Sequence, residues 1–406
     1  MWTGNRFSFC RRLASRCIRN FPPVRRLRKE IRNIPVCAKE QRTGCFLGRT
    51  CEVVLESGAM GDFIAAIWWY LLLAVYGLAV APISFLLFRR FPDSGLLLAR
   101  PLGLLLATYL SWILGYLIGY PFSFLGIVGG LVFLGGLSFG VFWPRRTRIL
   151  RSYRSSARFL IVAEVLTIAA FLLLIQARRF DPNLDHTEMG MDLAFFRSLW
   201  KGTGIPPVDP WFAGEPINYY YGGYMIFAGI AKIGGLSTGV AYNLSVSTVF
   251  MLAVSGAFVL GTALTASRIW GAVTVLCTVI IGNLAGFFRL IEYGTLSFDQ
   301  FSMRWRYLWN TSRVIYDGTE SQGQQTINEY PFFAEVWGNL HGHMANIPWV
   351  LLFVCLTVAL LWSGMDRRSP MKWLKVSWPL LFVLVISLGG LGFANLFDLP
   401  TFSLLY

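Results

Sequence analysis

The chain has 406 residues, of which 55% are hydrophobic and 14% are charged. This composition excludes an ordinary soluble domain and predicts an all-α polytopic membrane protein. The net charge of +15 would suggest nucleic acid as the partner of a soluble protein. Here the basic residues stand in short clusters between apolar segments, as they do in cytoplasmic loops. We therefore expect the lipid bilayer, and no nucleic acid, as a partner.

Residues 1–59 differ from the rest of the chain, because they hold 13 of its 36 basic residues and five of its seven cysteines. No signal-peptide core precedes Asp62. Three interpretations are open: a basic disordered arm, a zinc-binding segment, or translated upstream sequence before a true start at Met60. The cysteine spacings lack a CxxC pair, which weakens the zinc interpretation. We favour an extension that is not native to the protein.

The apolar segments predict about eight transmembrane helices, since a span needs about 20 residues to cross roughly 30 Å of hydrocarbon. The first three form an N-terminal group within 60–158, and residues 159–406 form the membrane core. The chain stops at Tyr406 inside an apolar run, which predicts a further span and a chain truncated at its C-terminus. The eight predicted spans are 62–88, 101–119, 122–143, 159–177, 240–265, 269–288, 346–363 and 376–396.

The basic residues predict the orientation of these spans. Arginines cluster between the third and fourth spans, in 145–158, which places that loop in the cytoplasm and makes the span 159–177 run outward. The basic cluster at 367–375 also falls inside, provided that the short apolar segment 219–235 does not cross. We therefore predict that 219–235 is a re-entrant or interfacial helix.

Two large loops, 178–239 and 289–345, then share the external face of the plasma membrane. Their convergence predicts one site built from both loops. The same orientation places residues 1–59 outside, where their basic residues would resist translocation. This is a second reason to regard that extension as not native.

The first external loop carries an acidic pattern. Asp185, Glu188 and Asp192 have the spacing i, i+3, i+7, which would place them on one face of a helix. A local alternative makes Asp185 an N-cap with Glu188 closing a capping box. Carboxylates beside a membrane suit general-base work on a hydroxyl, or a divalent cation such as Mg or Mn that holds a phosphate. Glu188 and Asp192 are therefore candidate catalytic or metal-binding residues.

A proline-rich, aromatic segment follows, and its prolines predict a stiff extended path. Tyrosine rings beside carboxylates suit stacking on a sugar or contact with a lipid phosphate. The alternative is an aromatic belt, because tyrosine is enriched at membrane interfaces in any case. The candidate substrate-binding residues of this segment are Asp209, Asn218, Tyr219, Tyr220 and Tyr221.

The second external loop contributes Glu329, Asn339, His341 and His343 as further candidate substrate-binding residues. The chain has three histidines, and the third, His186, lies in the first external loop. His341 and His343 suit a metal if the chain is extended there, or hydrogen bonds to a phosphate or a sugar hydroxyl, or a structural role. Three arginines of this loop either pair with a phosphate or lie in water: Arg304, Arg306 and Arg313.

Several function classes have no support in the sequence. The chain lacks a P-loop, GxSxG and HExxH motifs, and a GxGxxG motif placed between a strand and a helix. ATP-driven transport and zinc peptidase activity are therefore not expected.

The motifs MGMDLAFF, PPVDPWFAGEPINYYYGGY, AYNLS, IGNLAGFF, SRVIYDG, INEYPFFAEVWGNLHGHMANIP and NLFDLPT follow one another along the chain. Together they resemble the YYY membrane-protein family, uncharacterised polytopic proteins of bacteria and archaea, from about residue 60 to 406. The family pattern usually has Asp and His-Pro-His where this chain has Asn339 and His341-Gly342-His343. A carboxylate role at position 339 is therefore in doubt.

That family is in turn distantly similar to the GT-C class of membrane glycosyltransferases. The resemblance implies a GT-C-like arrangement, a polyprenyl-phosphate sugar donor and an acidic residue just after an outward span, for which Glu188 is the best match and Asp192 the next. One departure is that three spans precede the outward span. The expected function is a membrane glycosyltransferase. One alternative is a lipid or solute transporter or flippase, which would favour ionisable groups within the spans. Glu164 is found there and little else, and this scarcity disfavours transport. The other alternative is a non-catalytic protein of envelope assembly.

Overall fold

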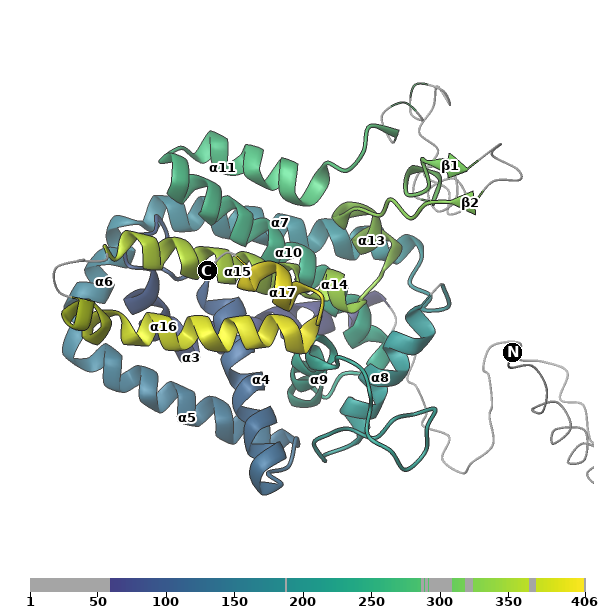
Figure 1. Cartoon of the computed structure of the whole chain (residues 1–406), viewed down its shortest axis with the longest axis horizontal. Helices are drawn as coiled ribbons and strands as arrows, with labels where there is room; N and C mark the ends of the chain where they lie inside the picture. The colour runs from purple at the N-terminus through teal and green to yellow at the C-terminus, as the bar shows by residue number, and fades with distance from the viewer. Residues whose placement is uncertain are drawn as a thin grey trace, which may run out of the picture. The chain divides into compact units, whose positions relative to one another are not determined.

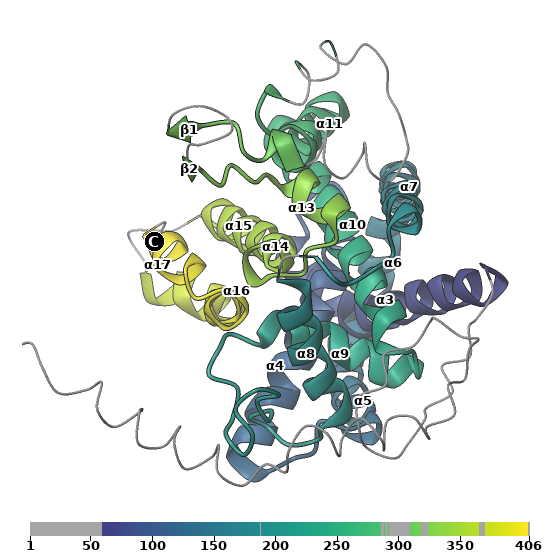
Figure 2. The ribbon, with the colours of Figure 1, turned by 90° about the vertical axis from the view of Figure 1, so that its right-hand side faces the viewer.

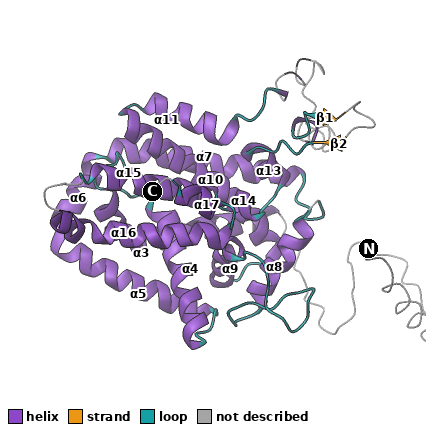
Figure 3. Cartoon of the chain, viewed as in Figure 1, coloured by secondary structure: helices purple, strands orange, loops and turns teal. Residues whose placement is uncertain are grey.

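The structure is a computed structural model that describes residues 59–186, 188–285, 288, 291, 309–317, 324–364 and 370–404. Nearly all of the predicted extension 1–59 lies outside these residues, as do Arg304 and Arg306. In the described residues, the regular secondary structure is helical, apart from one antiparallel pair of two-residue strands, and loops connect these elements (Figure 3). The prediction of an all-α fold is confirmed.

The helices follow the predicted apolar segments. The N-terminal part holds α3 (Ala59–Phe88), α4 (Ala99–Ile118), α5 (Phe124–Phe142), η3 (Trp143–Arg145), α6 (Arg146–Ser155) and α7 (Ala157–Phe180). The middle holds α8 (Met189–Lys201), α9 (Gly222–Gly234), α10 (Thr238–Thr265), α11 (Arg268–Val275) and η4 (Leu276–Ile280). Then come β1 (Tyr316–Asp317), β2 (Gln324–Gln325), α13 (Pro331–Trp337), α14 (Gly342–Ala345), α15 (Ile347–Trp362), α16 (Pro370–Ala394) and α17 (Asp398–Ser403).

Six of the eight predicted spans form helices that are long and apolar enough to cross a membrane: Gly61–Phe88, Ala99–Ile118, Phe124–Ser155, Ala157–Phe180, Thr238–Thr265 and Ser377–Ala394. The other two form shorter apolar helices, Arg268–Ile280 and Ile347–Trp362. At 1.5 Å per residue, the 16 residues of α15 cover only about 24 Å. The structure therefore supports several spanning helices, six of them by length and composition.

Helix α10 is the centre of the helical core, as Figures 1 and 2 show. An apolar stretch of 18 residues in α10 is entirely buried, whereas only 33% of the corresponding stretch of α7 is buried. Several of its buried hydroxyls donate to its own backbone, since Ser245 donates to the carbonyl of Ala241 and Thr248 to that of Leu244. Such bonds let polar residues lie in an apolar interior without another partner.

Helix α9, which follows the three tyrosines, is also buried. It has 13 residues, about 20 Å of helix, which is short of the hydrocarbon thickness. Residues 222–231 are all buried, and a Cβ added to Gly222 would lie 2.5 Å from the ring of Phe393. These contacts are with other parts of the protein, and the prediction of a re-entrant or interfacial helix stays a prediction. Close packing against other helices holds α9 inside the protein.

Candidate functional site

Asp192 lies in the first turn of α8 and is completely buried. Its Oδ1 accepts a hydrogen bond of 2.5 Å from the hydroxyl of Tyr224 on α9, and its Oδ2 lies 3.4 Å from the hydroxyl of Tyr242 on α10. The N-terminus of a helix favours a negative charge. The packing of α8 across α9 and α10 therefore creates a buried acceptor site in which a carboxylate is stabilised.

His341 reaches the same carboxylate from the connection between α13 and α14. Its Nδ1 lies 3.4 Å from Oδ1 of Asp192 and 3.1 Å from Oε2 of Glu188. Its Nε2 lies 3.0 Å from the hydroxyl of Tyr219, which donates to the hydroxyl of Tyr220 at 2.6 Å. We call these five residues, Glu188, Asp192, Tyr219, Tyr220 and His341, the His341 cluster. It joins the two predicted external loops.

The two carboxylates of the cluster differ in their exposure to solvent. The side chain of Glu188 is 58% exposed, that of His341 is 12% exposed, and that of Asp192 is 0% exposed. Glu188 is therefore accessible from outside the protein, whereas Asp192 contacts only other side chains.

The electrostatics of the cluster favour a charged imidazole. Burial alone would lower the pKa of His341, but the hydrogen bond and charge of Asp192, followed by the charge of Glu188, outweigh it and raise the pKa. Burial, the bond to Tyr220 and the nearby carboxylates raise the pKa of Tyr219. Two carboxylates facing Nδ1 require a proton on that nitrogen. An imidazolium can also donate from Nε2 to the Tyr219 hydroxyl.

A buried arginine fixes the chain segment that precedes His341. Arg178, at the end of α7, donates to the carbonyls of Val336 and Trp337 at the end of α13, 3.2 and 3.0 Å away, and to Oδ1 of Asn243. A cation at a helix C-terminus satisfies carbonyls that lack helical partners. Gly338 follows with φ of +92°, and a Cβ there would lie 2.5 Å from the guanidinium carbon. Arg178 and Gly338 thus set the path toward His341.

The turn at His341 is equally constrained. Oδ1 of Asn339 accepts a hydrogen bond of 2.7 Å from the backbone N–H of His341. A Cβ added to Gly342 would lie 2.2 Å from Cε2 of Tyr220 and 2.7 Å from the carbonyl oxygen of Ala394. Asn339 therefore shapes the turn, and glycine at 342 lets the Tyr220 ring pack directly on the backbone.

The comparisons with known proteins agree with the membrane fold. The model of one family, described as "Uncharacterized membrane protein (DUF2298)", matches residues 106–406. The chain belongs to this family. The matched region runs from α4 onward and includes every residue of the His341 cluster. No curated protein and no solved structure matches the chain.

Three predicted binding residues of this DUF2298 protein take no part in the cluster. Oδ1 of Asp209 accepts from the backbone N–H groups of Trp211 and Phe212, at 2.8 and 2.9 Å. Asn218 is exposed. Tyr221 is buried, and its hydroxyl accepts from the indole of Trp112 at 3.1 Å. Of the three consecutive tyrosines, the first two reach the cluster and the third packs inside the protein.

The predicted acidic face of three carboxylates does not form in the DUF2298 protein. Helix α8 begins at Met189, with Glu188 in the capping position, so Asp185 precedes the helix and does not cap it. Oδ1 of Asp185 lies 2.7 Å from Nδ1 of His186, whose Nε2 lies 2.9 Å from Oδ2 of Asp181. His186 and its two aspartates therefore stabilise the loop apart from the cluster.

Glu329 and His343 flank the cluster. Oε1 of Glu329 lies 3.1 Å from Nη2 of Arg313, so this arginine is paired within the protein. The charge of Glu329 also acts to raise the pKa of His341 and His343. Desolvation, followed by the charge of His341 5.2 Å away between ring centroids, lowers the pKa of His343. His343 therefore favours the neutral form beside a charged His341.

The side chains of the cluster do not fit a metal ion as they are arranged. Both oxygens of Asp192 face phenolic hydroxyls. The two carboxylates that face Nδ1 of His341 favour a proton on that nitrogen, which then has no lone pair for a metal. Within the described ranges, no group of three His, Cys, Asp or Glu side chains could hold an ion. Of the predicted ligands, Glu188, Asp192 and His341 instead contact one another through hydrogen bonds and charge pairs, and the ring of His343 packs beside that of His341.

Three residues that shape the site were not among the residues predicted from the sequence: Tyr224, Tyr242 and Arg178. The hydroxyl of Tyr242 both faces Asp192 and accepts from the backbone N–H of Leu340, at 3.2 Å, next to His341. The two tyrosines lie inside apolar helical segments, where they resemble packing residues. Arg178 could have been predicted, because a charged residue at the end of an apolar span needs a partner when it is buried.

Proposed function

We propose that the protein is a membrane glycosyltransferase that takes a sugar from a polyprenyl-phosphate donor, with its site on the external face of the plasma membrane. The observation that supports this best is the pairing of an accessible carboxylate, Glu188, with a cationic His341 at 3.1 Å. The resemblance to the GT-C class supports the donor and the GT-C-like arrangement. The distribution of basic residues supports the external face.

The proposed reaction is a displacement at the anomeric carbon of the sugar. Glu188 accepts the proton of the acceptor hydroxyl as that oxygen forms its bond to the anomeric carbon. The bond between this carbon and the phosphate oxygen breaks, and the electron pair leaves with the polyprenyl phosphate. The imidazolium of His341 offsets the negative charge that develops on that phosphate. No step requires a metal ion held by the cluster.

The remaining residues of the cluster have supporting roles in this proposal. Asp192 is a positioning residue, since its full burial keeps it from touching a substrate and it acts by orienting and charging His341. Tyr219 and Tyr220 offer aromatic rings and hydroxyls to the sugar. Glu329 and His343 lie at the edge of the cluster, where Glu329 contributes negative charge and a neutral His343 offers a hydrogen-bonding group to the substrate.

A transfer assay tests the proposal. The full-length protein in liposomes receives a panel of radiolabelled polyprenyl-phosphate sugars and a lipid extract of the cell envelope. We expect transfer of label by the wild type and none by Glu188→Gln. Transfer by folded Glu188→Gln at the wild-type rate would remove Glu188 from the mechanism. No transfer across the panel, with donor binding confirmed, would favour a lipid-binding, transport or envelope-assembly role.

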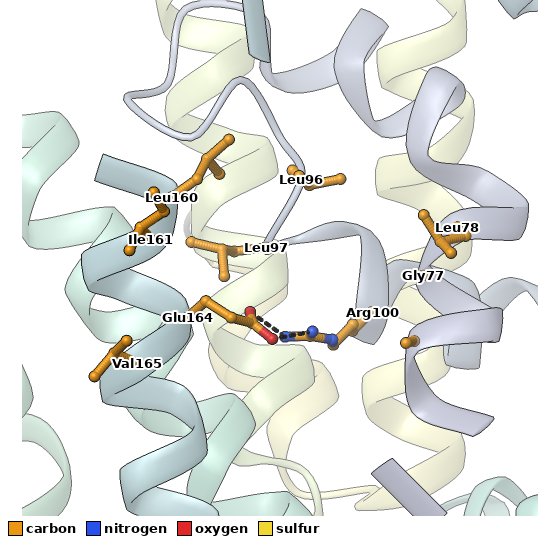
Figure 4. Close-up of a pocket in the computed structure, with 10 residues that line it drawn as sticks. Gly77, Leu78, Leu96, Leu97, Arg100, Leu160, Ile161, Glu164 and Val165 are labelled. Atoms are coloured by element: carbon orange, nitrogen blue, oxygen red, sulfur yellow. Dashed lines mark hydrogen bonds and ion pairs between the residues drawn. The ribbon is translucent and has the colours of Figure 1, made fainter. Parts of the chain in front are cut away.

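A second candidate function, lipid transport, is favoured by one observation inside the spans. Figure 4 shows Arg100 of α4 and Glu164 of α7 joined across a pocket of about 420 Å³. The guanidinium makes two contacts with the carboxylate, 2.9 and 2.6 Å long, and the hydroxyl of Tyr70 donates to the same carboxylate at 2.5 Å. The pocket is otherwise apolar. Ionisable groups at membrane depth often mark a transport path.

A lipid-exchange assay separates the two candidates. Fluorescent lipid analogues in liposomes report movement between leaflets, and Arg100→Leu/Glu164→Leu removes both charges together, which avoids leaving one charge unpaired. Loss of lipid exchange in this variant, with sugar transfer absent in the wild type, would establish transport. Sugar transfer that depends on Glu188 and survives in the double variant supports the transferase.

A further inference from the structure

The loop between α8 and α9 ends in an exposed apolar tip. Val208, Trp211 and Phe212 are 59%, 61% and 70% exposed. We call residues 208–216 the aromatic finger. Large aromatic side chains at this exposure outside the spanning helices need an explanation, since exposed apolar patches usually mark an interaction surface.

The aromatic finger is held in one shape by its own hydrogen bonds. Asp209 accepts from the two backbone N–H groups at the tip, its own N–H donates to the carbonyl of Glu215 at 2.8 Å, and Val208 pairs with Pro216. Gly214 turns the chain with φ of +95°. The aromatic residues are therefore presented on a fixed frame, which reduces the entropy lost when they bind.

The base of the finger is attached to spanning helices. The backbone N–H of Phe122, in the turn between α4 and α5, donates to the carbonyl of Thr203 at 2.8 Å, and Ile205 packs where Gly115 of α4 has no side chain. Figures 1 and 2 both show this loop beside the end of α4. The finger thus starts beside the ends of α4 and α5, two helices that are long and apolar enough to cross a membrane.

The neighbouring surface is apolar as well. Exposed side chains crowd the end of α4 and the start of α5: Tyr116, Leu117, Ile118, Phe124 and Leu125. Lipid covers such residues when they belong to spanning helices. The finger continues this lipid-facing surface beyond the helix ends, where tryptophan is enriched at the boundary between headgroups and acyl chains. A bilayer therefore fits the finger better than a protein partner does.

We propose that the aromatic finger inserts Trp211 and Phe212 into the leaflet on the side of the His341 cluster. The finger then fixes the height of the loop that carries Tyr219 and Tyr220 relative to the membrane surface. This inference rests on the exposed tip and its attachment, and it holds whichever reaction the cluster performs.

Photo-crosslinking in nanodiscs of phosphatidylcholine and phosphatidylglycerol tests the proposal. The full chain carries p-benzoylphenylalanine in place of Phe212, in place of Val132 as a lipid-facing control that is 68% exposed on α5, or in place of Glu215 as an exposed control on the returning side of the finger. We expect lipid adducts at 212 within about twofold of those at 132, and at least fivefold fewer at 215. Protein adducts at 212, or no adducts in folded protein, would overturn the proposal.

A second measurement does not depend on the unnatural side chain. The fluorescence emission that is lost on Trp211→Phe isolates the contribution of Trp211. We expect lipids brominated on the acyl chain near the headgroup to quench this component, and aqueous iodide to leave it nearly unchanged. Quenching by iodide alone would place the tip in water and reject insertion.

Discussion

His341 Nδ1 lies 3.4 Å from Asp192 Oδ1, although 149 residues separate the two along the chain. The contact brings the loop before α14 onto the first turn of α8. Asp192 is fully buried, so its charge acts on the imidazole and not on a ligand. Glu188 lies against the same nitrogen of the imidazole and is 58% exposed. In the proposed reaction, Glu188 is therefore the group that meets the substrate, and Asp192 is the group that positions His341.

Glu188→Gln should reduce transfer strongly while leaving the fold intact. The amide keeps the size of the side chain but cannot accept a proton, and general-base catalysis is worth about 10²- to 10⁴-fold in rate. The transfer rate and the melting temperature of the purified variant check this. Because the Glu188 side chain is 58% exposed, we expect a change in melting temperature of no more than a few degrees.

Asp185→Asn is the matched control for that variant. Asp185 is another exposed carboxylate of the same loop, and it pairs with His186 outside the His341 cluster. We expect it to retain the transfer rate within about twofold. A loss equal to that of Glu188→Gln would show that the loop as a whole, and not the carboxylate of Glu188, determines the rate.

The transfer rate should fall on the alkaline side. His341 has a raised pKa in the folded protein, so its charge is fully present below the ordinary histidine value of about 6.5 and is lost as the pH rises through the raised value. Asp192, Glu188 and Glu329 favour that charge, and burial of the imidazole opposes it. A pH–rate profile of the wild type should show this alkaline loss, and His341→Gln should lack it. A flat wild-type profile up to pH 9 would contradict a role for the imidazolium.

Asp192→Asn should destabilise the protein and lower the pKa of His341. The buried carboxylate accepts from Tyr224 and attracts the charge on His341, and a hydrogen bond to a charged group contributes about 1.5–3 kcal/mol. Thermal unfolding in detergent should show a loss of several degrees. Tyr224→Phe, which removes one donor and keeps the charge, should lose less and keep the wild-type pH profile. An equal fall in melting temperature in both variants would mean that the charge of Asp192 adds nothing to the stability of the protein.

The sequence predicted the helices and the acidic residues because both leave local patterns. Apolar length predicted α3, α4, α5, α7, α10 and α16. The acidic spacing made Glu188 a candidate, and the resemblance to the GT-C class implied its role by its position after an outward span. Tyr224 and Tyr242 left no pattern, because each looks like a packing residue until α8 places Asp192 against it, 32 and 50 residues away. The prediction of one acidic face was wrong for a local reason. Helix α8 begins after Asp185, and Asp185 pairs with His186 instead.

Gly342→Ala adds only one methyl group, but it should displace Tyr220 and lower both the stability of the protein and the transfer rate. The added Cβ would lie 2.2 Å from the Tyr220 ring and 2.7 Å from the carbonyl oxygen of Ala394. The ring can turn away only by leaving the hydroxyl of Tyr219, and the carbonyl belongs to the end of α16, so both must move. Overpacking of this kind costs about 1–3 kcal/mol, and we expect a melting temperature lower by several degrees together with a reduced transfer rate.

Gly190→Ala separates this steric effect from the general effect of replacing a glycine. Gly190 lies in α8 two residues from Asp192, and an added Cβ there meets nothing within 4 Å. Because alanine favours a helix over glycine by up to about 1 kcal/mol, this variant should be as stable as the wild type or slightly more stable. If Gly342→Ala matched it in melting temperature and rate, Tyr220 would have room to move, and the tight packing of the ring on this backbone would not be what holds the tyrosines beside His341.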